Sequence, residues 1–389
     1  MSEQSVSRRT MLKTTGAVAA AAAFASLGTN FAWAAGSDKL KVGLVGCGGR
    51  GTGAAFDICH ASPRVQITAL GDLFKDSPGP NKEAGLDHAR KQLKEGGNNG
   101  KGVGEQYGVT DANCFVGFDS YKGVTDSGVD LVMLCTPPGF RPQHFAYAIE
   151  KNKHVFFEKP VAVDPTQVRQ IIETSDKAKE KNLGVLTGTL FRHHKTHQEI
   201  IRRIHSGEIG DIVAGNSYYN ATELWFCAKK PEWTDTEFQI RNWLYYTWLS
   251  GDLIVEQNVH RIDIMNWVMQ GPPVAAYGTG GRQVRTNPHY GNVYDHFAIE
   301  YEYKNGVKIT NFCRQQDGTD TRVTEYFTGT KGVAAPGEGW IGDRQFAGAN
   351  GKSGQGYKTK PVPWGEAYVQ EHKDLIKSIE DGKPLNEGR

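Results

Sequence analysis

The stretch K-V-G-L-V-G-C-G-G-R-G-T-G, residues 41–53, decides the fold of this chain. Its first residues are mostly apolar, which predicts a buried strand. The strand runs directly into a G-x-G-x-x-G pattern at the point where a helix should begin. Gly46 permits the tight turn, Gly48 lets a pyrophosphate approach the backbone, and Gly51 lets the helix pack closely on the strand. Because the N–H groups of a helix N-terminus bind phosphate, the pattern predicts a dinucleotide site formed by Gly46, Gly48, Gly49, Arg50 and Gly51.

A second apolar, β-branched run, residues 65–70, ends at a Gly-Asp pair. Asp72 follows the last glycine of the motif by about twenty residues, where an acid typically binds the adenosine ribose hydroxyls. A carboxylate there repels a ribose phosphate, and Leu73 and Phe74 provide no arginine to receive one. Lys75 is the nearest cation, so we expect NAD, with NADP as the alternative. A glycine turn opening an ordinary βα unit is the interpretation without a nucleotide.

The composition limits the kind of protein this is. A chain of 389 residues is long for a single hydrophobic core, so we expect two domains. The formal net charge of +2, with scattered lysines and arginines, argues against a nucleic-acid partner. The cysteines are irregularly spaced and form no C-x-x-C pair, so we expect reduced, mostly buried thiols: Cys47, Cys59, Cys114, Cys135, Cys227 and Cys313.

Residues 1–34 are predicted to be an export signal and not part of the fold. Arg8 and Arg9 precede an apolar, alanine-rich run, Gly16–Leu27, which is too short for a permanent membrane anchor. A small-x-small sequence then offers a cleavage site before Ala35. The pattern resembles a twin-arginine signal, which predicts a periplasmic protein with the twin-arginine export machinery as a partner. Since such proteins are exported folded, we expect a tightly bound cofactor that is loaded beforehand. An ordinary secretory signal and an uncleaved anchor are the alternatives.

Strands alternate with helices over residues 35–160, which predicts a dinucleotide-binding domain with a parallel, doubly wound sheet. Strands are expected at 129–136 and 154–157, with a helix at 143–151. Residues 75–104 are polar and glycine-rich, and we expect a surface insertion there. Because ligands bind at the carboxyl ends of such strands, the predicted cofactor contacts also include Thr136, Pro137, Glu158 and Lys159.

Residues 161–389 are expected to form a second α/β domain. A helix at 165–179 and a strand at 184–190 are expected to pack on the first sheet, and a helix at 196–206 follows. Several alternating runs then predict a large, open, mostly antiparallel sheet, with strands at 212–219, 274–280, 296–303, 307–313 and 323–327. An aromatic stretch that contains Trp243 separates the first two runs.

Lys159 lies between Glu158 and Pro160 at the end of a predicted strand. Proline removes a backbone donor and biases its neighbour toward extended geometry, which would direct the lysine into the crevice. There its ammonium could stabilise an oxygen as hydride leaves the adjacent carbon. The alternative is a surface lysine paired with Glu158.

The segment D-L-I-V-E-Q-N-V-H-R-I-D, residues 252–263, is a second candidate site. Glu256 and His260 are four residues apart, and His260 and Asp263 are three apart, so one helix would place all three on one face. An acid paired with histidine suits general acid/base chemistry near neutral pH. A capped helix with a satisfied histidine is the alternative.

A third cluster, R-H-H-K-T-H, contains Arg192, His193, His194 and His197. An i, i+4 histidine pair can bind zinc, but the sequence lacks the glutamate of H-E-x-x-H and a clear third ligand. We expect no metal here. These residues are expected to line the substrate cleft or to be exposed.

Four landmarks, V-G-L-V-G-C-G-G-R-G, C-T-P-P, E-K-P and V-E-Q-N-V-H-R-I-D, occur in this order and resemble the glucose–fructose oxidoreductase/inositol dehydrogenase (Gfo/Idh/MocA) family. The resemblance implies a Rossmann domain, NAD(H) or NADP(H), and a second domain whose open sheet often mediates oligomerisation, as a dimer or tetramer. It also implies that Lys159 contacts substrate and nicotinamide and that His260 is the general acid/base. Glu256 stands where many of these dehydrogenases have aspartate, so a simple inositol or glucose specificity does not follow.

On this resemblance we expect an exported oxidoreductase that acts on a carbinol of a sugar or polyol. Arg192, Asp263 and Trp243 are the candidate substrate contacts, with Trp225 and Tyr246 as further stacking platforms. Some relatives are NAD-dependent glycosidases that oxidise, eliminate, hydrate and reduce without net redox change, and this remains an alternative. A non-catalytic sugar-binding module is another alternative, and it would not need Lys159 or His260.

Overall fold

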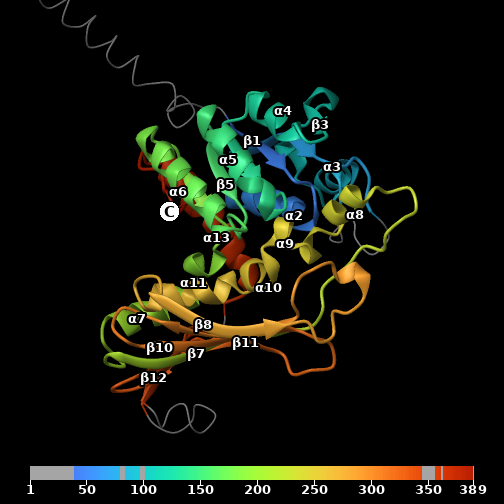
Figure 1. Ribbon diagram of the computed structural model, residues 1–389. Helices are drawn as coiled ribbons and strands as arrows, with labels where there is room; N and C mark the ends of the chain where they lie inside the picture. The colour runs from blue at the N-terminus through green and yellow to red at the C-terminus, as the bar shows by residue number, and fades with distance from the viewer. Residues whose placement is uncertain (1–38, 79–83, 97–100, 344–354, 361, 389) are drawn as a thin grey trace, which may run out of the picture.

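The computed structural model describes residues 39–78, 84–96, 101–343, 355–360 and 362–388, which form two stacked α/β domains (Figure 1). Each domain contains one sheet, with six strands in the first and eight in the second. The predicted fold class, a doubly wound sheet followed by an α/β domain with a large open sheet, is confirmed. The predicted export signal lies outside the described residues.

The first sheet is entirely parallel and has the strand order β3-β2-β1-β4-β5-β6, the order of dinucleotide-binding doubly wound folds. Its centre is apolar on both faces because helices cover both sides. The strands are β1 (Leu40–Val45), β2 (Val65–Asp72), β3 (Cys114–Val116), β4 (Leu131–Leu134), β5 (His154–Phe157) and β6 (Val185–Thr187).

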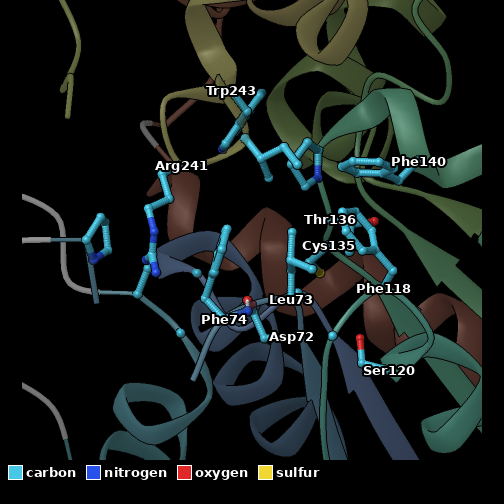
Figure 2. Close-up of a pocket in the computed structure, with 18 of the residues that line it drawn as sticks. Asp72, Leu73, Phe74, Phe118, Ser120, Cys135, Thr136, Phe140, Arg241 and Trp243 are labelled. Carbon is cyan, nitrogen blue, oxygen red and sulfur yellow. Dashed lines mark hydrogen bonds between the residues drawn. The ribbon is translucent and has the colours of Figure 1, made fainter. Parts of the chain in front are cut away.

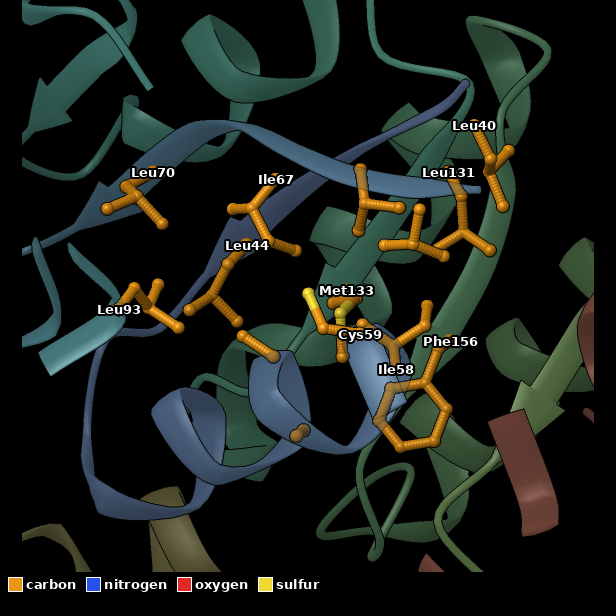
Figure 3. Packing of buried hydrophobic residues seen from close by; sticks show 14 of the residues in the cluster. Leu40, Leu44, Ile58, Cys59, Ile67, Leu70, Leu93, Leu131, Met133 and Phe156 are labelled. Carbon is orange, nitrogen blue, oxygen red and sulfur yellow. The ribbon is translucent and has the colours of Figure 1, made fainter. Parts of the chain in front are cut away.

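Helices pack on both faces of this sheet (Figure 1). Figure 3 shows Ile58 and Cys59 of the first of them against Leu44, Ile67 and other strand residues, and all of these are buried. The helices are α2 (Gly49–Ala61), α3 (Leu86–Glu95), α4 (Ser120–Asp126), α5 (Arg141–Glu150), α6 (Pro165–Glu180) and the C-terminal α13 (Trp364–Glu380).

The end of the described chain returns to the first domain. After α13, the backbone N–H of Glu387 donates to the Val185 carbonyl at 2.9 Å, and that of Val185 donates to the Leu385 carbonyl at 2.7 Å. Residues 385–387 therefore cover the edge of β6. The sequence patterns did not predict α13, although its helix positions a tyrosine and a tryptophan near the candidate site.

The second sheet has the order β14-β13-β12-β11-β7-β10-β9-β8 and is antiparallel except for the β10–β7 pair. Alternation in β10 turns Ile309 and Cys313 inward and leaves Phe312 exposed on the other face. The strands are β7 (Ile212–Ala221), β8 (Ala275–Gly281), β9 (His296–Glu302), β10 (Lys308–Gln315), β11 (Arg322–Gly329), β12 (Val333–Ala335), β13 (Trp340–Gly342) and β14 (Gly356–Lys358).

Helices lie on the face of this sheet that is turned toward the first domain (Figure 1). They are α7 (Lys195–His205), α10 (Asp252–Glu256) and α11 (Val259–Val268), and α8 (Asp235–Arg241) and α9 (Thr247–Ser250) belong to the aromatic stretch. The short 3-10 helices are η1 (Gly104–Gln106), η2 (Asp111–Asn113), η3 (Pro138–Phe140), η4 (Leu190–His193), η5 (Trp243–Tyr245), η6 (Pro288–Tyr290) and η7 (Pro336–Glu338). Among the described helices, none is both long and apolar enough to cross a membrane.

Candidate functional site

The glycine loop has a different steric requirement at each glycine. Gly46 has φ +95°, and a Cβ there would lie 2.6 Å from the backbone of Thr136. A Cβ on Gly51 would lie 1.9 Å from the Gly46 carbonyl oxygen, so only glycine lets α2 approach the loop. A Cβ on Gly48 or Gly49 would meet no atom within 4 Å, so this side of the loop is open. The loop thus provides a tight turn behind and free space in front.

The open side of the loop faces the N-terminus of α2. No side chain caps this helix, and no acidic residue lies in its first turn. Its first backbone N–H groups and its dipole therefore suit an anion such as a pyrophosphate. The residues present fit a dinucleotide.

Asp72 lies at the end of β2 and is fixed by two backbone donors. The Cys47 N–H donates to Oδ2 at 2.6 Å, and the Phe74 N–H donates to Oδ1 at 2.8 Å. Asp72 thus lies at a cleft that Gly46, Gly48, Thr136 and Pro137 also line. This arrangement suits the ribose contact that the sequence predicts for Asp72.

Both domains contribute walls to this cleft (Figure 2). Leu73, Phe74, Phe118 and Ser120 line it from the first domain. The second domain supplies Ile240, Arg241 and Trp243. Trp243, which the sequence suggested as a sugar platform, therefore lies in the same cleft as Asp72. No local pattern indicated that Arg241 would reach Phe74 and Asp76, because the contact joins residues far apart in the chain.

Arg50 follows the glycine loop, and its side chain connects the loop to the E-K-P tripeptide. Its Nε lies 2.8 Å from Glu158 Oε1, and its Nη2 lies 2.8 Å from Asp57. The guanidinium also stacks over the Tyr368 ring at 4.3 Å. Burial lowers the pKa of Arg50, but the negative charges of Glu158 and Asp57 raise it by more. The net result is a raised pKa. Arg50, whose side chain is 36% exposed, thus pairs with the buried carboxylate of Glu158.

Lys159 crosses the domain boundary to Glu256. Its Nζ donates to the Glu256 backbone carbonyl at 2.8 Å and lies 3.1 Å from Oε1 of the same residue. The adjacent Pro160 carbonyl accepts a hydrogen bond from the buried guanidinium of Arg141 on α5. The lysine of E-K-P is therefore held at the strand end, facing the second domain and not paired with Glu158.

His260 has no hydrogen bond to Glu256 or Asp263 within the described parts of the chain. The shared face expected if these residues lay on one helix is not formed, because α10 ends at Glu256 and α11 begins at Val259. Asn258, between the two helices, is fully buried and its side-chain amide donates to Asn311 Oδ1 at 2.5 Å in the sheet below, which holds the break in place. Glu256 is instead the partner of Lys159.

The imidazole of His260 packs at the edge of the Phe191 ring, with centroids 5.3 Å apart. Burial lowers the pKa of His260 well below its usual value, and the positive charges of Lys159 and Arg261 lower it further. His260 is therefore neutral near pH 7 and able to accept a proton. This is the state that a general base requires.

Arg192 and Asp263, both predicted substrate contacts, pair with each other. Arg192 Nε lies 3.0 Å from both carboxylate oxygens of Asp263, and Nη2 lies 2.7 Å from Oδ1. Burial raises the pKa of Asp263, and the Arg192 charge opposes this shift. A bidentate pair of this kind fixes the start of α11, which carries His260 one turn earlier.

Residues that the sequence did not single out lie beside these groups. The Tyr219 hydroxyl donates to Gln257 Oε1 at 2.7 Å, and the Gln257 amide donates to Glu256. Trp364 is 48% exposed and packs edge-on against Phe191 at 5.0 Å. The sequence contains no local signal for this cluster, because its members come from β7, the α10–α11 connection and α13. Aromatic side chains beside a few polar groups are typical of small-molecule sites.

The three histidines near Arg192 are buried and not exposed, and two of them pair with each other. His193 Nδ1 lies 2.6 Å from Asp374 Oδ2, and the His194 and His197 Nδ1 atoms lie 2.9 Å apart. In the described residues, no group of three His, Cys, Asp or Glu side chains has the geometry of a metal site. Four of the six cysteines are buried, which agrees with the expectation that most of them are core residues.

Two family models match the chain. Residues 40–187 match the model of an oxidoreductase family with an NAD-binding Rossmann fold. Residues 197–335 match the GFO/IDH/MocA C-terminal domain. Together they cover most of the described chain.

Individual relatives share about a quarter of the aligned residues with this chain. An inositol 2-dehydrogenase of Salmonella paratyphi B is 23% identical over 231 residues, which is 59% of this chain and 54% of that protein. A glycosyl hydrolase family 109 protein of Bacteroides fragilis is 26% identical over 291 residues, 72% of this chain and 54% of that protein. The chain thus spans about half the length of these curated relatives.

The solved structures share the fold. A scyllo-inositol dehydrogenase from Lactobacillus casei, solved with bound NAD(H) and scyllo-inositol, has a TM-score of 0.62 and 19% identity. The match covers 90% of this chain and 91% of that chain. At this identity the likeness supports the two-domain architecture and not a particular substrate.

Proposed function

Because this chain belongs to the Gfo/Idh/MocA family of oxidoreductases, we propose that it transfers hydride between a nicotinamide dinucleotide and a carbinol carbon of a sugar or polyol. The main support is that Lys159 and Glu256 meet across the domain boundary beside a neutral His260. Relatives named as inositol dehydrogenases support the choice of a polyhydroxylated substrate.

The dinucleotide, when bound, supplies the hydride acceptor or donor. Gly48, Gly49 and the first turn of α2 would hold its pyrophosphate, and Asp72 would bind its adenosine ribose. The carboxylate also repels a ribose phosphate, so we propose NAD as the preferred cofactor, with NADP second.

His260 takes the proton of the reacting hydroxyl in the direction of oxidation. Its lowered pKa keeps the imidazole neutral and ready to accept that proton. Lys159 donates a hydrogen bond to the same oxygen and stabilises its negative charge, while Glu256 holds the ammonium in place. In the direction of reduction, His260 returns the proton.

The relative named as a glycosyl hydrolase supports a second candidate function. A redox-neutral glycosidase would oxidise a ring carbinol, eliminate the aglycone, add water and reduce the ring again. It would use the same Lys159 and His260 but release no oxidised sugar.

One experiment separates these functions. The cofactor of the purified protein is released by denaturation and identified, and the holoprotein is then incubated with a panel of polyols, sugars and glycosides. Reduced-nicotinamide absorbance with an oxidised product supports the dehydrogenase, and aglycone release without net redox change supports the glycosidase. Sugar binding without either reaction would leave only the binding module, and recovery of NADP alone would overturn the NAD preference.

We also propose that the protein is exported folded, with its cofactor tightly bound, to the periplasm. The paired Arg8 and Arg9 before an alanine-rich run support this proposal. Arg8→Lys combined with Arg9→Lys should leave the precursor in the cytoplasm. Normal periplasmic accumulation of this double variant would contradict the twin-arginine route.

The second sheet supports a further proposal, that the protein is a homo-oligomer, either a dimer or a tetramer. Its outer face carries Phe312, which is 36% exposed, and Tyr277 of the edge strand β8 is 84% exposed. Large exposed aromatic side chains on one face are typical of protein interfaces. Light scattering should give a mass of two or four chains, and a monomer at micromolar concentration would contradict this.

A further inference from the structure

The second domain closes part of the cleft that begins at Asp72. Arg241 ends α8 and Trp243 begins η5, and both line the cavity that Asp72 and Phe74 line from the first domain. Figure 2 shows Arg241 extending toward Phe74. Because Asp72 is placed to bind the adenosine ribose, these residues surround the adenosine half of the cofactor.

Arg241 is buried, with 6% exposure, and is held by groups of both domains. Its guanidinium carbon lies 3.7 Å from the centroid of the Phe74 ring, and its Nη2 lies 3.1 Å from Asp76 Oδ1. Within its own helix, Nε lies 2.9 Å from Glu237 Oε1. Two carboxylates therefore neutralise the guanidinium, and an aromatic face covers it.

One residue, Phe74, connects Arg241 to Asp72, the acid that would bind the ribose. The ring of Phe74 packs against Arg241, while the backbone N–H of Phe74 donates to Asp72 Oδ1 at 2.8 Å. A loss of Arg241 would free the segment that orients Asp72. The contact between the domains at Arg241 thus helps to hold Asp72 in the orientation that suits the ribose.

We propose that Arg241 is a positioning residue that closes the adenosine end of the cofactor cleft across the domain boundary and thereby slows cofactor release. The cofactor leaves when the second domain releases Phe74 and Asp76. This inference rests on the proposed NAD-dependent function, and it gives a structural basis for the tight binding proposed above.

The chain provides a matched control for a variant of Arg241. Arg203 also stacks over an aromatic ring, at 3.7 Å from the centroid of Tyr357, and its Nε lies 2.7 Å from Glu199, four residues away on its helix. Arg203 does not line the cleft. Arg241→Gln and Arg203→Gln therefore remove nearly the same interactions at two different places.

The test measures the rate at which bound NADH is displaced by excess NAD in stopped-flow fluorescence, together with the melting temperature. Arg241→Gln should release NADH about tenfold faster or more, because it loses a desolvated cation–π contact and an ion pair. Arg203→Gln should release it at the wild-type rate. Asp76→Asn, which leaves the buried guanidinium in place, should accelerate release in the same direction but by less.

A second measurement shows which half of the cofactor Arg241 affects. Arg241→Gln should weaken the binding of ADP-ribose as much as that of NADH and leave the binding of reduced nicotinamide mononucleotide unchanged. Wild-type release rates in a folded Arg241→Gln and in Asp76→Asn would overturn the proposal for Arg241 alone. A wild-type protein that binds neither NADH nor NAD would overturn the proposed function as well, so the two failures are distinguishable.

Discussion

Lys159 Nζ lies 3.1 Å from Glu256 Oε1, so the lysine at the end of a Rossmann strand is paired with an acid of the second domain. The two side chains are 16% and 7% exposed, respectively, and the pair is largely shielded from water. Removing one partner of such a pair leaves a buried charge without compensation. The catalytic and structural effects of Lys159 must therefore be measured separately.

Lys159→Met should lower turnover by a hundredfold or more, because the reacting oxygen loses its charged donor. It should also lower the free energy of unfolding by about 3–5 kcal/mol, because the Glu256 carboxylate is left unpaired. Adding Glu256→Gln should recover most of that stability and none of the turnover. Single-turnover nicotinamide reduction and denaturant unfolding of both variants test this. Recovered turnover in the double variant would show that the lysine has only a structural role.

His260→Asn should lower turnover by about 10²–10⁴-fold while NADH still binds, since asparagine cannot accept a proton at neutral pH. In the double variant with Lys159→Met, the loss of transition-state stabilisation should be smaller than the sum of the two single losses. The reason is that both groups act in one proton transfer. The wild-type rate of oxidation should stay constant from pH 8 down to pH 6.5, because the lowered pKa keeps His260 neutral over that range. A stable His260→Asn with unchanged turnover would remove this residue from the mechanism.

Gly51→Ala should destabilise the first domain by about 1–3 kcal/mol and weaken NADH binding, because its Cβ would collide with the Gly46 carbonyl oxygen. Gly53→Ala is the control in the same helix, since its Cβ would meet only Arg50 Nη1 at 3.8 Å. It should stabilise the helix by up to about 1 kcal/mol. Thermal melting with and without NADH compares the two, and equal effects would contradict the close approach of α2 to the loop.

His193 gives a pH-dependent contribution to stability. Burial lowers its pKa, but hydrogen bonds to Asp374 and Glu387 raise it more, to about 9. Because the pKa is raised in the folded state, the stabilisation is complete below about pH 6.5 and is lost as the pH rises through 9. The difference in unfolding free energy between wild type and His193→Gln should therefore shrink by up to about 3 kcal/mol over that interval.

The control for that measurement is His205→Gln. His205 is exposed on α7 and bonds the Trp267 carbonyl at 3.1 Å. The change measured for His205→Gln over the same pH interval is subtracted as the baseline for an exposed histidine. An unchanged difference for His193→Gln would show that its pairing with Asp374 does not control its protonation.

The sequence predicted the elements whose patterns are local. The expected strand at 154–157 matches β5, and the alternating runs of the second domain correspond to β7–β11 within a few residues. The three-residue strands β12, β13 and β14 were missed because so short a segment has no measurable periodicity. Glu256 and His260 do not share one helix, because the buried Asn258–Asn311 contact overrides the helical spacing between them.

The candidate site was predictable only where a motif marks it. Asp72 and Lys159 lie at strand ends, so the parallel topology placed them in the crevice. Arg241 and Tyr368 come from elements far along the chain, and no spacing rule connects them to the glycine loop. Their places depend on how the two domains pack, which is a property of the tertiary structure.

The most direct test of hydride transfer uses polyols, sugars and glycosides deuterated at each carbinol carbon in turn. The NAD-loaded protein is rapidly mixed with each substrate and quenched, and the mass of the nicotinamide is measured. We expect deuterium on the nicotinamide from a substrate labelled at the reacting carbon, either persistent for a dehydrogenase or transient for the redox-neutral glycosidase. His260→Asn should show almost none on the same timescale. A wild-type protein that binds NAD and sugar but leaves the nicotinamide unlabelled across the panel would contradict the proposed function.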